Sequence, residues 1–389
     1  MTHRERFYAT VTHQATDRAV FDLCGISQTF VDFQETKDDL AKLMNLTGDP
    51  HGDYNIDERI LLALDIDTRC VGGMPTPISS HRREESGVLY DNFGIGWRDV
   101  GDRFEICHNP LKDCTKSEME DYVFPDPKDT DNELIDKWAA KAEFLHTKTD
   151  YAVIAEHPVL GVFELGCWLF GFDDYLYRLI GEPEVVHTFS KRVIEYQKQM
   201  ISIYYGALGQ YIDCTNSGDD FGTQNAPFMS KAMFDEMVAP YLKERITYTK
   251  TFTKAFYLQH SCGAVFELIP SLIDCGVDIL NPIQPGVFQM EPERLIAEYG
   301  DKIAFWGGVD VQQLLPYGSV EDVKTEVKRI LSIFDRSGYI LSPAHAVQYD
   351  VPAQNLLAVY EAAREFYGGT LSCCLNTLCN SREYNKGVF

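Results

Sequence analysis

Ile303-Ala-Phe-Trp-Gly307 is a short apolar run, and Tyr339-Ile-Leu-Ser342 is a second one. Between them, in Glu321–Phe334, apolar residues recur at steps of 4, 7, 8 and 11: Val323, Val327, Ile330, Leu331 and Phe334. Those steps place the five side chains on one face of a helix, whereas the flanking runs have the length of buried strands. The stretch therefore predicts a strand–helix–strand unit whose two strands are parallel.

The same alternation extends back to about residue 150. Further strands are expected at Tyr151–Ala155, Val159–Leu165, Tyr211–Cys214, Ala255–His260 and Val277–Asn281. Helices are expected at Asp173–Ala207, from Lys231 to about Phe252, from Pro270, and at Pro352–Tyr367. An eight-stranded barrel and a doubly wound sheet both fit this pattern. The barrel is favoured, because no G-x-G-x-x-G follows a strand as in dinucleotide-binding sheets.

The first 150 residues are more polar and irregular. Val88–Trp97 predicts a hairpin, because Asp-Asn and two glycines interrupt alternating apolar residues. Phe124–Asp131 contains two prolines and predicts a turn-rich connection, and a helix is expected at Asn132–Thr147. The expected organisation is one domain over residues 1–389, in which 1–150 form an N-terminal part with insertions and 151–372 form regular β/α units.

Composition excludes several classes of function. The 35 Lys and Arg against 59 Asp and Glu give a formal charge of −24, which argues against nucleic acid and anionic membrane surfaces as partners. No apolar run is long enough to span a bilayer, and the first residues have no apolar signal region. The odd number of cysteines, 11, then suggests reduced thiols and a cytoplasmic protein. The sequence leaves the oligomeric state open, a homodimer included.

Two loops carry the strongest chemical signals. Gln259-His-Ser-Cys-Gly263 ends a predicted strand, and residues at i and i+2 project to the same side, so His260 and Cys262 point together into the barrel mouth. Imidazole and thiolate are preferred zinc ligands. His345 follows the strand at residues 339–342 and opens onto the same face, as a third ligand or a general acid. A buried cysteine beside a hydrogen-bonded histidine is the alternative.

Other predicted strands also end in polar residues. Asp219, Asp220 and Gln224 follow one strand, Asn281 another, and Trp306 and Asp310 lie around the glycine pair at 307–308. Turn and capping roles are equally compatible with each of them. Cys373, Cys374 and Cys379 lack an accompanying histidine and are expected to be packed or surface thiols, and the remaining cysteines to be buried small hydrophobic residues.

The chain resembles the uroporphyrinogen decarboxylase superfamily. The matching segments are Arg4-Glu-Arg-Phe with Asp17-Arg18, Gly218–Gln224, His260-Ser-Cys-Gly263, Asp278-Ile-Leu-Asn281, Phe305–Asp310 and Ser342-Pro-Ala-His345. The resemblance implies a (β/α)8 TIM barrel. It leaves the reaction open, because the superfamily holds both decarboxylases and cobalamin-linked methyltransferases.

The methyltransferases of the superfamily bind zinc through an H-x-C pair and a later cysteine. His260 and Cys262 match the pair, and His345 stands where the later cysteine is expected. The resemblance therefore implies Zn²⁺ held by His260, Cys262 and His345, since imidazole also ligates zinc. A histidine in the same late loop also occurs in decarboxylases, so His345 alone does not discriminate.

The arginine pattern favours a methyltransferase. Decarboxylases receive the porphyrinogen carboxylates on an Arg-rich N-terminal segment, whereas this chain has no Lys or Arg between Arg18 and Lys37. Burying carboxylates without cations is costly. Phe21 lies in this segment and is expected either to line the pocket or to pack in the core.

The expected function is a zinc-dependent transfer of a methyl group between a small substrate and the cobalt of a corrinoid. Candidate substrates are methoxylated aromatics, which would be O-demethylated, methylamines and thiols. No D-x-H-x-x-G motif for cobalamin occurs, so the corrinoid is expected on a separate protein. Asp220 and Asp310 are candidates for proton transfer, and Gln224, Asn281, Trp306 and Phe21 for substrate binding. A porphyrinogen-type decarboxylase and a non-catalytic tetrapyrrole-binding barrel are the alternatives.

Overall fold

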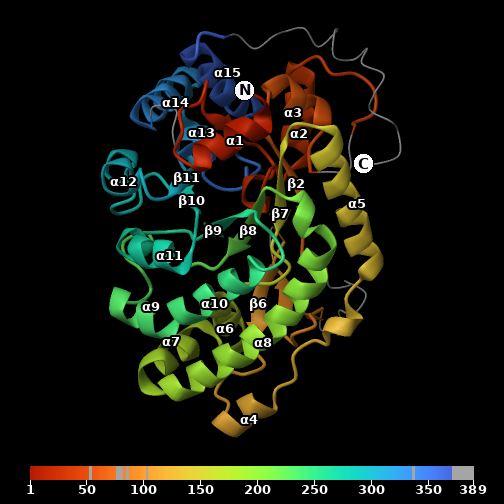
Figure 1. The fold of residues 1–389 in the computed structure, drawn as a ribbon, viewed down its shortest axis with the longest axis vertical. Coiled ribbons are helices and arrows are strands. Elements are labelled where there is room, and N and C mark those ends of the chain that lie inside the picture. The colour runs from red at the N-terminus through yellow and green to blue at the C-terminus, as the bar shows by residue number, and fades with distance from the viewer. Residues whose placement is uncertain (52–54, 76–81, 85–86, 102–103, 335–337, 370–389) are drawn as a thin grey trace.

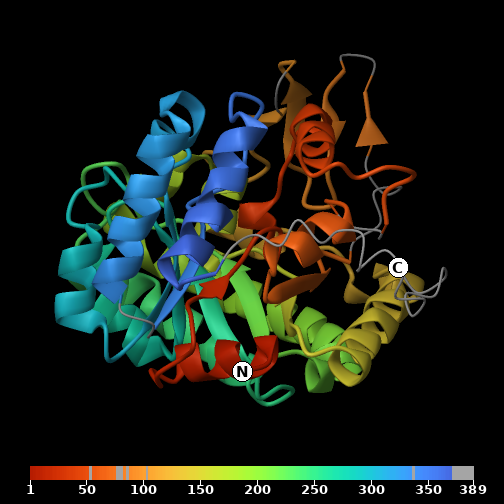
Figure 2. The ribbon, with the colours of Figure 1, turned by 90° about the horizontal axis from the view of Figure 1, so that it is seen from above.

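The strands predicted after residue 150 join two earlier ones in an eight-stranded parallel sheet. The structure is a computed structural model, and it describes residues 1–51, 55–75, 82–84, 87–101, 104–334 and 338–369. The sheet curls into a (β/α)8 barrel with helices around it (Figure 1, Figure 2). In spatial order its strands are β1 (Val20–Phe21), β12 (Tyr339–Pro343), β11 (Ala304–Val309), β10 (Ile279–Ile283), β9 (Phe256–His260), β8 (Cys214–Gly218), β7 (Ala152–Glu156) and β2 (Thr68–Gly72).

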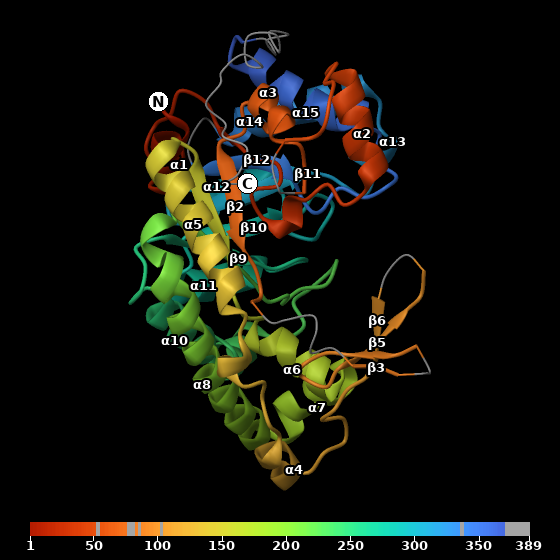
Figure 3. The same ribbon diagram turned by 90° about the vertical axis from the view of Figure 1, so that its right-hand side faces the viewer.

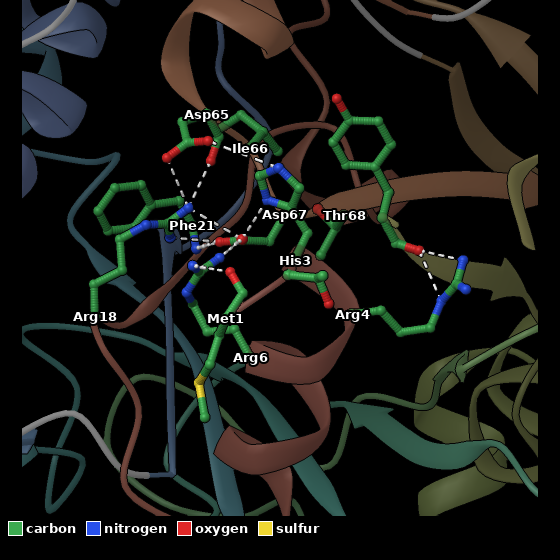
Figure 4. A network of polar contacts seen from close by, with 12 residues as sticks. Met1, His3, Arg4, Arg6, Arg18, Phe21, Asp65, Ile66, Asp67 and Thr68 are labelled. Carbon is green, nitrogen blue, oxygen red and sulfur yellow. Dashed lines mark hydrogen bonds and ion pairs between the residues drawn. The ribbon is translucent and has the colours of Figure 1, made fainter. Parts of the chain in front are cut away.

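The barrel closes between β1 and β2 through the carboxylate of Asp67. The Asp67 backbone N–H donates to the Phe21 carbonyl at 2.9 Å, and the Phe21 N–H donates to Asp67 Oδ2 at 2.7 Å. Arg6 and Arg18 each reach the same buried carboxylate at 2.6 Å, as Figure 4 shows. A charged cluster thus replaces the missing strand ladder at the end of the barrel opposite the site.

Most helices cover the outside of the sheet, because an amphipathic helix buries its apolar face. In α14 (Val320–Phe334) the five residues predicted to share a face are the buried ones. The other helices are α1 (His3–Val11), α2 (Gln34–Leu43), α3 (Glu58–Leu64), α4 (Lys116–Asp121), α5 (Asn132–Lys148), α6 (Val162–Phe170), α7 (Phe172–Gly181), α8 (Pro183–Leu208), α9 (Lys231–Met237), α10 (Ala239–Thr249), α11 (Ile269–Cys275), α12 (Pro292–Tyr299), α13 (Leu314–Tyr317) and α15 (Ala353–Phe366). No helix among the described residues is both long and apolar enough to cross a bilayer.

A second, antiparallel sheet stands at the side of the barrel, beside α6 and α7 (Figure 3). It consists of β3 (Arg82–Arg83), β4 (Leu89–Tyr90), β5 (Gly96–Asp99) and β6 (Phe104–His108). The hairpin predicted at residues 88–97 is confirmed as β4 and β5. The Trp97 ring, 5.3 Å from the Trp168 ring on α6, attaches this sheet to the barrel.

Some expected elements differ in the structure. The strand expected at Val159–Leu165 is wrong, because α6 begins at Val162 and buries almost its whole circumference. The expected strand at Tyr211–Cys214 begins only at Cys214, and the helix expected from Lys231 is divided into α9 and α10. Cys107 is exposed and Cys114 half-buried, whereas the predicted burial holds for Cys24, Cys70, Cys167, Cys214 and Cys275. Cys373, Cys374 and Cys379 lie outside the described residues.

The barrel interior is apolar toward the N-terminal ends of the strands and polar toward their C-terminal ends. Inward side chains at the lower levels form an apolar cluster, closed from beneath by Phe7 of α1, that includes Val20, Ile154, Leu258, Trp306 and Ile340. Two residues further along the strands, the inward positions are polar: Asp22, Glu156, Asn216, His260, Asn281 and Ser342. The strand ends therefore supply a polar floor at the C-terminal face, where barrel enzymes place their chemistry.

Candidate metal centre

His260 is the last residue of β9 and is held by a neighbouring strand. Its Nδ1 lies 2.6 Å from Oδ1 of Asn281 on β10, and the Asn281 amide nitrogen donates to the Trp306 carbonyl at 3.3 Å. A carbonyl only accepts, which fixes the amide orientation and makes Nδ1 of His260 the donor. The lone pair on Nε2 is therefore free to bind a metal, an arrangement common for metal-ligating histidines.

Cys262 lies beside this lone pair. Its Sγ is 3.4 Å from Nε2 of His260, and its backbone N–H donates to Oδ1 of Asp220 at 2.8 Å. Gly263, at φ +86°, lets the chain pass so close to the β8 loop that a Cβ would stand 2.4 Å from Gly222 carbon. Burial, followed by Asp220 and Glu164, raises the pKa of the Cys262 thiol to about 12. A thiolate here requires a cation beside it.

His345 completes the group from the loop after β12. Its ring centroid lies 5.7 Å from that of His260, with an angle of 64° between the planes. Desolvation of the ring by the surrounding protein lowers the pKa of His345, and the neighbouring His260 lowers it further. The imidazole is therefore neutral at pH 7, the form that ligates metals.

The three donors fit a zinc ion. Ligand atoms of His260, Cys262 and His345 all lie within 4.8 Å of one another. Tetrahedral zinc with bonds of about 2.0–2.3 Å holds its ligand atoms about 3.3–3.6 Å apart. The His260–Cys262 separation already has this value, and His345 needs a shift of at most about 1.5 Å. A zinc ion held by these two imidazoles and one thiolate would have a fourth tetrahedral position, which in catalytic zinc sites takes water or a substrate.

Carboxyl groups surround this triad. Asp220 is partly exposed, and its Oδ1 lies 3.7 Å from Nε2 of His260. Glu164, in the first turn of α6, has its pKa raised to about 8 by burial and then by Asp219 and Asp220. Asp219 instead points to the start of α6, where it accepts from the N–H groups of Phe163 and Glu164 at 3.2 and 2.7 Å. Asp219 therefore caps a helix and does not face the mouth.

The other residues singled out from the sequence take different places. Gln224 is exposed on the β8 loop. The Asp310 carboxylate accepts from the backbone N–H groups of residues 312, 313 and 314 and so anchors the start of α13. Trp306 is fully buried below the site with Nε1 on Asp22. Phe21 is fully buried against Tyr360 of α15, so it belongs to the core and does not line the pocket.

Two acidic residues of the site were missed in the sequence. Glu156 follows Ala152 and Ile154 at the same alternate positions of β7, so the strand pattern already directed it inward. Glu164 was not recognised because its segment was expected to be a strand, whereas it lies in the first turn of α6. Asn281 was expected to contact substrate, and the structure instead places it behind His260.

A family model and one solved structure agree with this architecture. The family model described as uroporphyrinogen decarboxylase (URO-D) matches residues 115–366. A methyltransferase from Methanosarcina mazei is similar at a TM-score of 0.67 and 15% identity, over 94% of this chain and 99% of that chain. A GH10 xylanase from termite gut gives a TM-score of 0.36 at 8% identity, over 57% and 62% of the two chains. No curated protein sequence matches the chain.

Proposed function

The chain belongs to the uroporphyrinogen decarboxylase family, and we propose that within it the protein is a zinc-dependent methyltransferase. The methyl group would move between a small substrate and the cobalt of a separate corrinoid protein. The observation that carries the proposal is the convergence of His260, Cys262 and His345 at the barrel mouth, with ligand atoms within 4.8 Å of one another. The methyltransferase from Methanosarcina mazei supports the proposal through its shared fold.

Each residue of the site would have a distinct role in the reaction. His260, Cys262 and His345 would hold the ion, which supplies Lewis acidity toward an oxygen or sulfur atom of the substrate. Asn281 fixes the ring of His260 for this purpose. Asp220 holds the Cys262 loop by accepting from its backbone N–H through Oδ1. The partly exposed carboxylate would accept a proton from the substrate.

Charge around the mouth favours this reaction over porphyrinogen decarboxylation. The groups described there include the carboxyl groups of Glu156, Glu164 and Asp220. Burial raises the pKa of Glu156 and of Glu164, and no cation is among the causes of either shift. Several substrate carboxylates would be repelled in such a site. Position 258, two residues before His260, is a buried leucine, so this chain offers no cobalamin-ligating histidine there, and the corrinoid is assigned to the partner protein.

A methyl-transfer assay tests the function. The protein is incubated with a reduced corrinoid protein and a methyl donor, either a methoxylated aromatic or a methylamine, or with a methylated corrinoid protein and a thiol acceptor. Formation of methyl-cobalt in the first case, and its consumption in the second, is followed by absorbance. The Cys262→Ala variant should lose at least about 100-fold in rate, because it removes a metal ligand. Cys107→Ala, on the exposed edge of the second sheet, is the matched control and should keep the rate. Equal rates for wild type and Cys262→Ala would contradict the proposal.

A further inference from the structure

Glu156 and Asn216 form a second polar centre inside the barrel. They are register partners on β7 and β8, and both side chains point inward. The Asn216 Nδ2 lies 2.9 Å from each Glu156 oxygen and 2.6 Å from Oε1 of Gln28. Ser27 donates to Glu156 from its backbone N–H at 2.7 Å and from its hydroxyl at 3.0 Å. The carboxylate is thus fixed by donors from two segments of the chain, at Ser27 and at Asn216.

This centre has acceptor capacity and charge left over. Asn216 is 2% exposed, and its Oδ1 has no hydrogen-bond partner among the described residues. The described contacts of Glu156 are an N–H group, a hydroxyl, an amide and the Cys70 thiol, so no lysine or arginine there balances its charge. Burial raises the pKa of Glu156. An unpaired carboxylate and an orphaned carbonyl oxygen in a protein interior are both costly, and a positively charged N–H donor satisfies both.

Open space lies beside both this centre and a metal ligand. Gly218 follows Asn216 at the next inward position of β8 and is the register partner of His260 on β9. A Cβ added at Gly218 would meet no heavy atom within 4 Å, so this inward position is open. A small molecule there would adjoin Asn216 on one side and His260 on the other.

We propose that the small substrate carries a protonated amine, which Glu156 and Asn216 bind while its thiol or methoxy end lies at His260, Cys262 and His345. This inference rests on the function proposed above and narrows its substrate to amino-thiols or amino-ethers. A neutral hydroxyl would satisfy Asn216 but leave the Glu156 charge unbalanced, so the site selects for the cation. An anionic group would be repelled.

Three thiols of matched length test the charge preference: 2-aminoethanethiol, 2-mercaptoethanol and mercaptoacetate. Their affinities for the zinc-loaded protein are measured by calorimetry. Because the three thiols differ in acidity, the preference is compared between wild type and Glu156→Gln. Wild type should favour the aminothiol over the alcohol by about 10- to 100-fold more than Glu156→Gln does, the range expected for a charged hydrogen bond. Glu143→Gln, an exposed site on α5, removes the same charge and should keep the wild-type preference.

Two results would overturn the inference. One is equal affinity of the wild-type protein for the three thiols, and the other is an undiminished preference in a folded Glu156→Gln variant. A second measurement separates this subsite from the metal: binding of propylammonium and of 1-propanol to metal-free Cys262→Ala. Preference for the cation there supports the amine subsite even if no methyl transfer is found. Loss of that preference alongside intact methyl transfer by wild type would reject the subsite and leave the proposed function standing.

Discussion

Asn281 positions His260, one of the three proposed metal ligands. It accepts from Nδ1 of His260 and is itself oriented by the Trp306 carbonyl. Asn281→Ala frees the imidazole to rotate and change tautomer, so zinc affinity should fall about 10- to 100-fold. Competition against a chromophoric chelator measures the change. Asn225→Ala, on the exposed part of the β8 loop, should leave the affinity unaltered, and an equal loss in both variants would refute the positioning role.

Proton release on zinc binding reports the ionisation state of Cys262. The pKa of its thiol is raised to about 12, so the metal-free thiol is protonated at neutral pH and must lose its proton to bind. The pKa of Glu164 is raised to about 8, and a dication nearby favours its ionised form. Zinc affinity should therefore rise with pH through the neutral range.

Calorimetry in buffers of different ionisation enthalpy counts these protons. Wild type should release more than one proton per zinc, and Glu164→Gln about one, because only the thiol then titrates. Zinc binding without proton release would mean that Cys262 does not ligate.

At the scale of elements, Asp67 joins the two ends of the barrel sheet. Burial alone would raise its pKa, but Arg18, His3 and Arg6 more than compensate, so the pKa of Asp67 lies below its usual value. Its stabilising contribution is present above the unfolded pKa of about 4 and is lost as pH falls through the lower folded value. Asp67→Asn should cost about 3–5 kcal/mol, because it leaves buried arginine charges uncompensated.

Urea unfolding monitored by circular dichroism measures this loss. Asp39→Asn is the control: Asp39 pairs with Lys42 on the exposed side of α2, and the change should alter the unfolding free energy by less than about 0.5 kcal/mol. A change below about 1 kcal/mol for Asp67→Asn would show that the barrel closes by other contacts.

The elements that could be predicted from the sequence are those whose own residues carry the pattern. The amphipathic face of α14 and the apolar runs of β9 to β12 were recognised in this way. The strand β2 was not recognised, because it contains the charged Arg69. Its guanidinium is buried by an ion pair with Glu58 and by stacking on the Tyr151 ring, and both partners lie outside β2. α6 was mistaken for a strand because it is buried nearly all round and lacks a polar face.

The same limit applies to the site. His260 and Cys262 were recognised because alternation along one strand brings them together, and the structure confirms that they face each other. The roles of Asp219 and Asp310 depend on which helix start they contact, and Asn281 on its neighbour across the sheet. Such roles arise from chain segments distant in sequence, which a local pattern does not contain.

At the scale of the whole molecule, the proposed metal binding would be linked to stability. The triad joins the loops after β9 and β12, which are brought together only in the folded barrel. Zinc binding to the folded chain alone should therefore stabilise it, by about 4 kcal/mol when free zinc exceeds the dissociation constant 1,000-fold. Thermal unfolding should shift upward with zinc and return with a chelator. Cys262→Ala should show no such shift, and an equal shift in this variant would place the metal elsewhere.

Zinc content measured on the purified protein tests the central claim most directly. The protein is prepared under reducing, zinc-replete conditions and freed of loosely bound metal. Its zinc content is then measured by inductively coupled plasma mass spectrometry, alongside His260→Ala, Cys262→Ala and the control Cys107→Ala. The account predicts about one zinc per chain in wild type and in Cys107→Ala, and a near-complete loss in the two ligand variants. Wild-type protein without zinc, or ligand variants that retain it, would contradict the account.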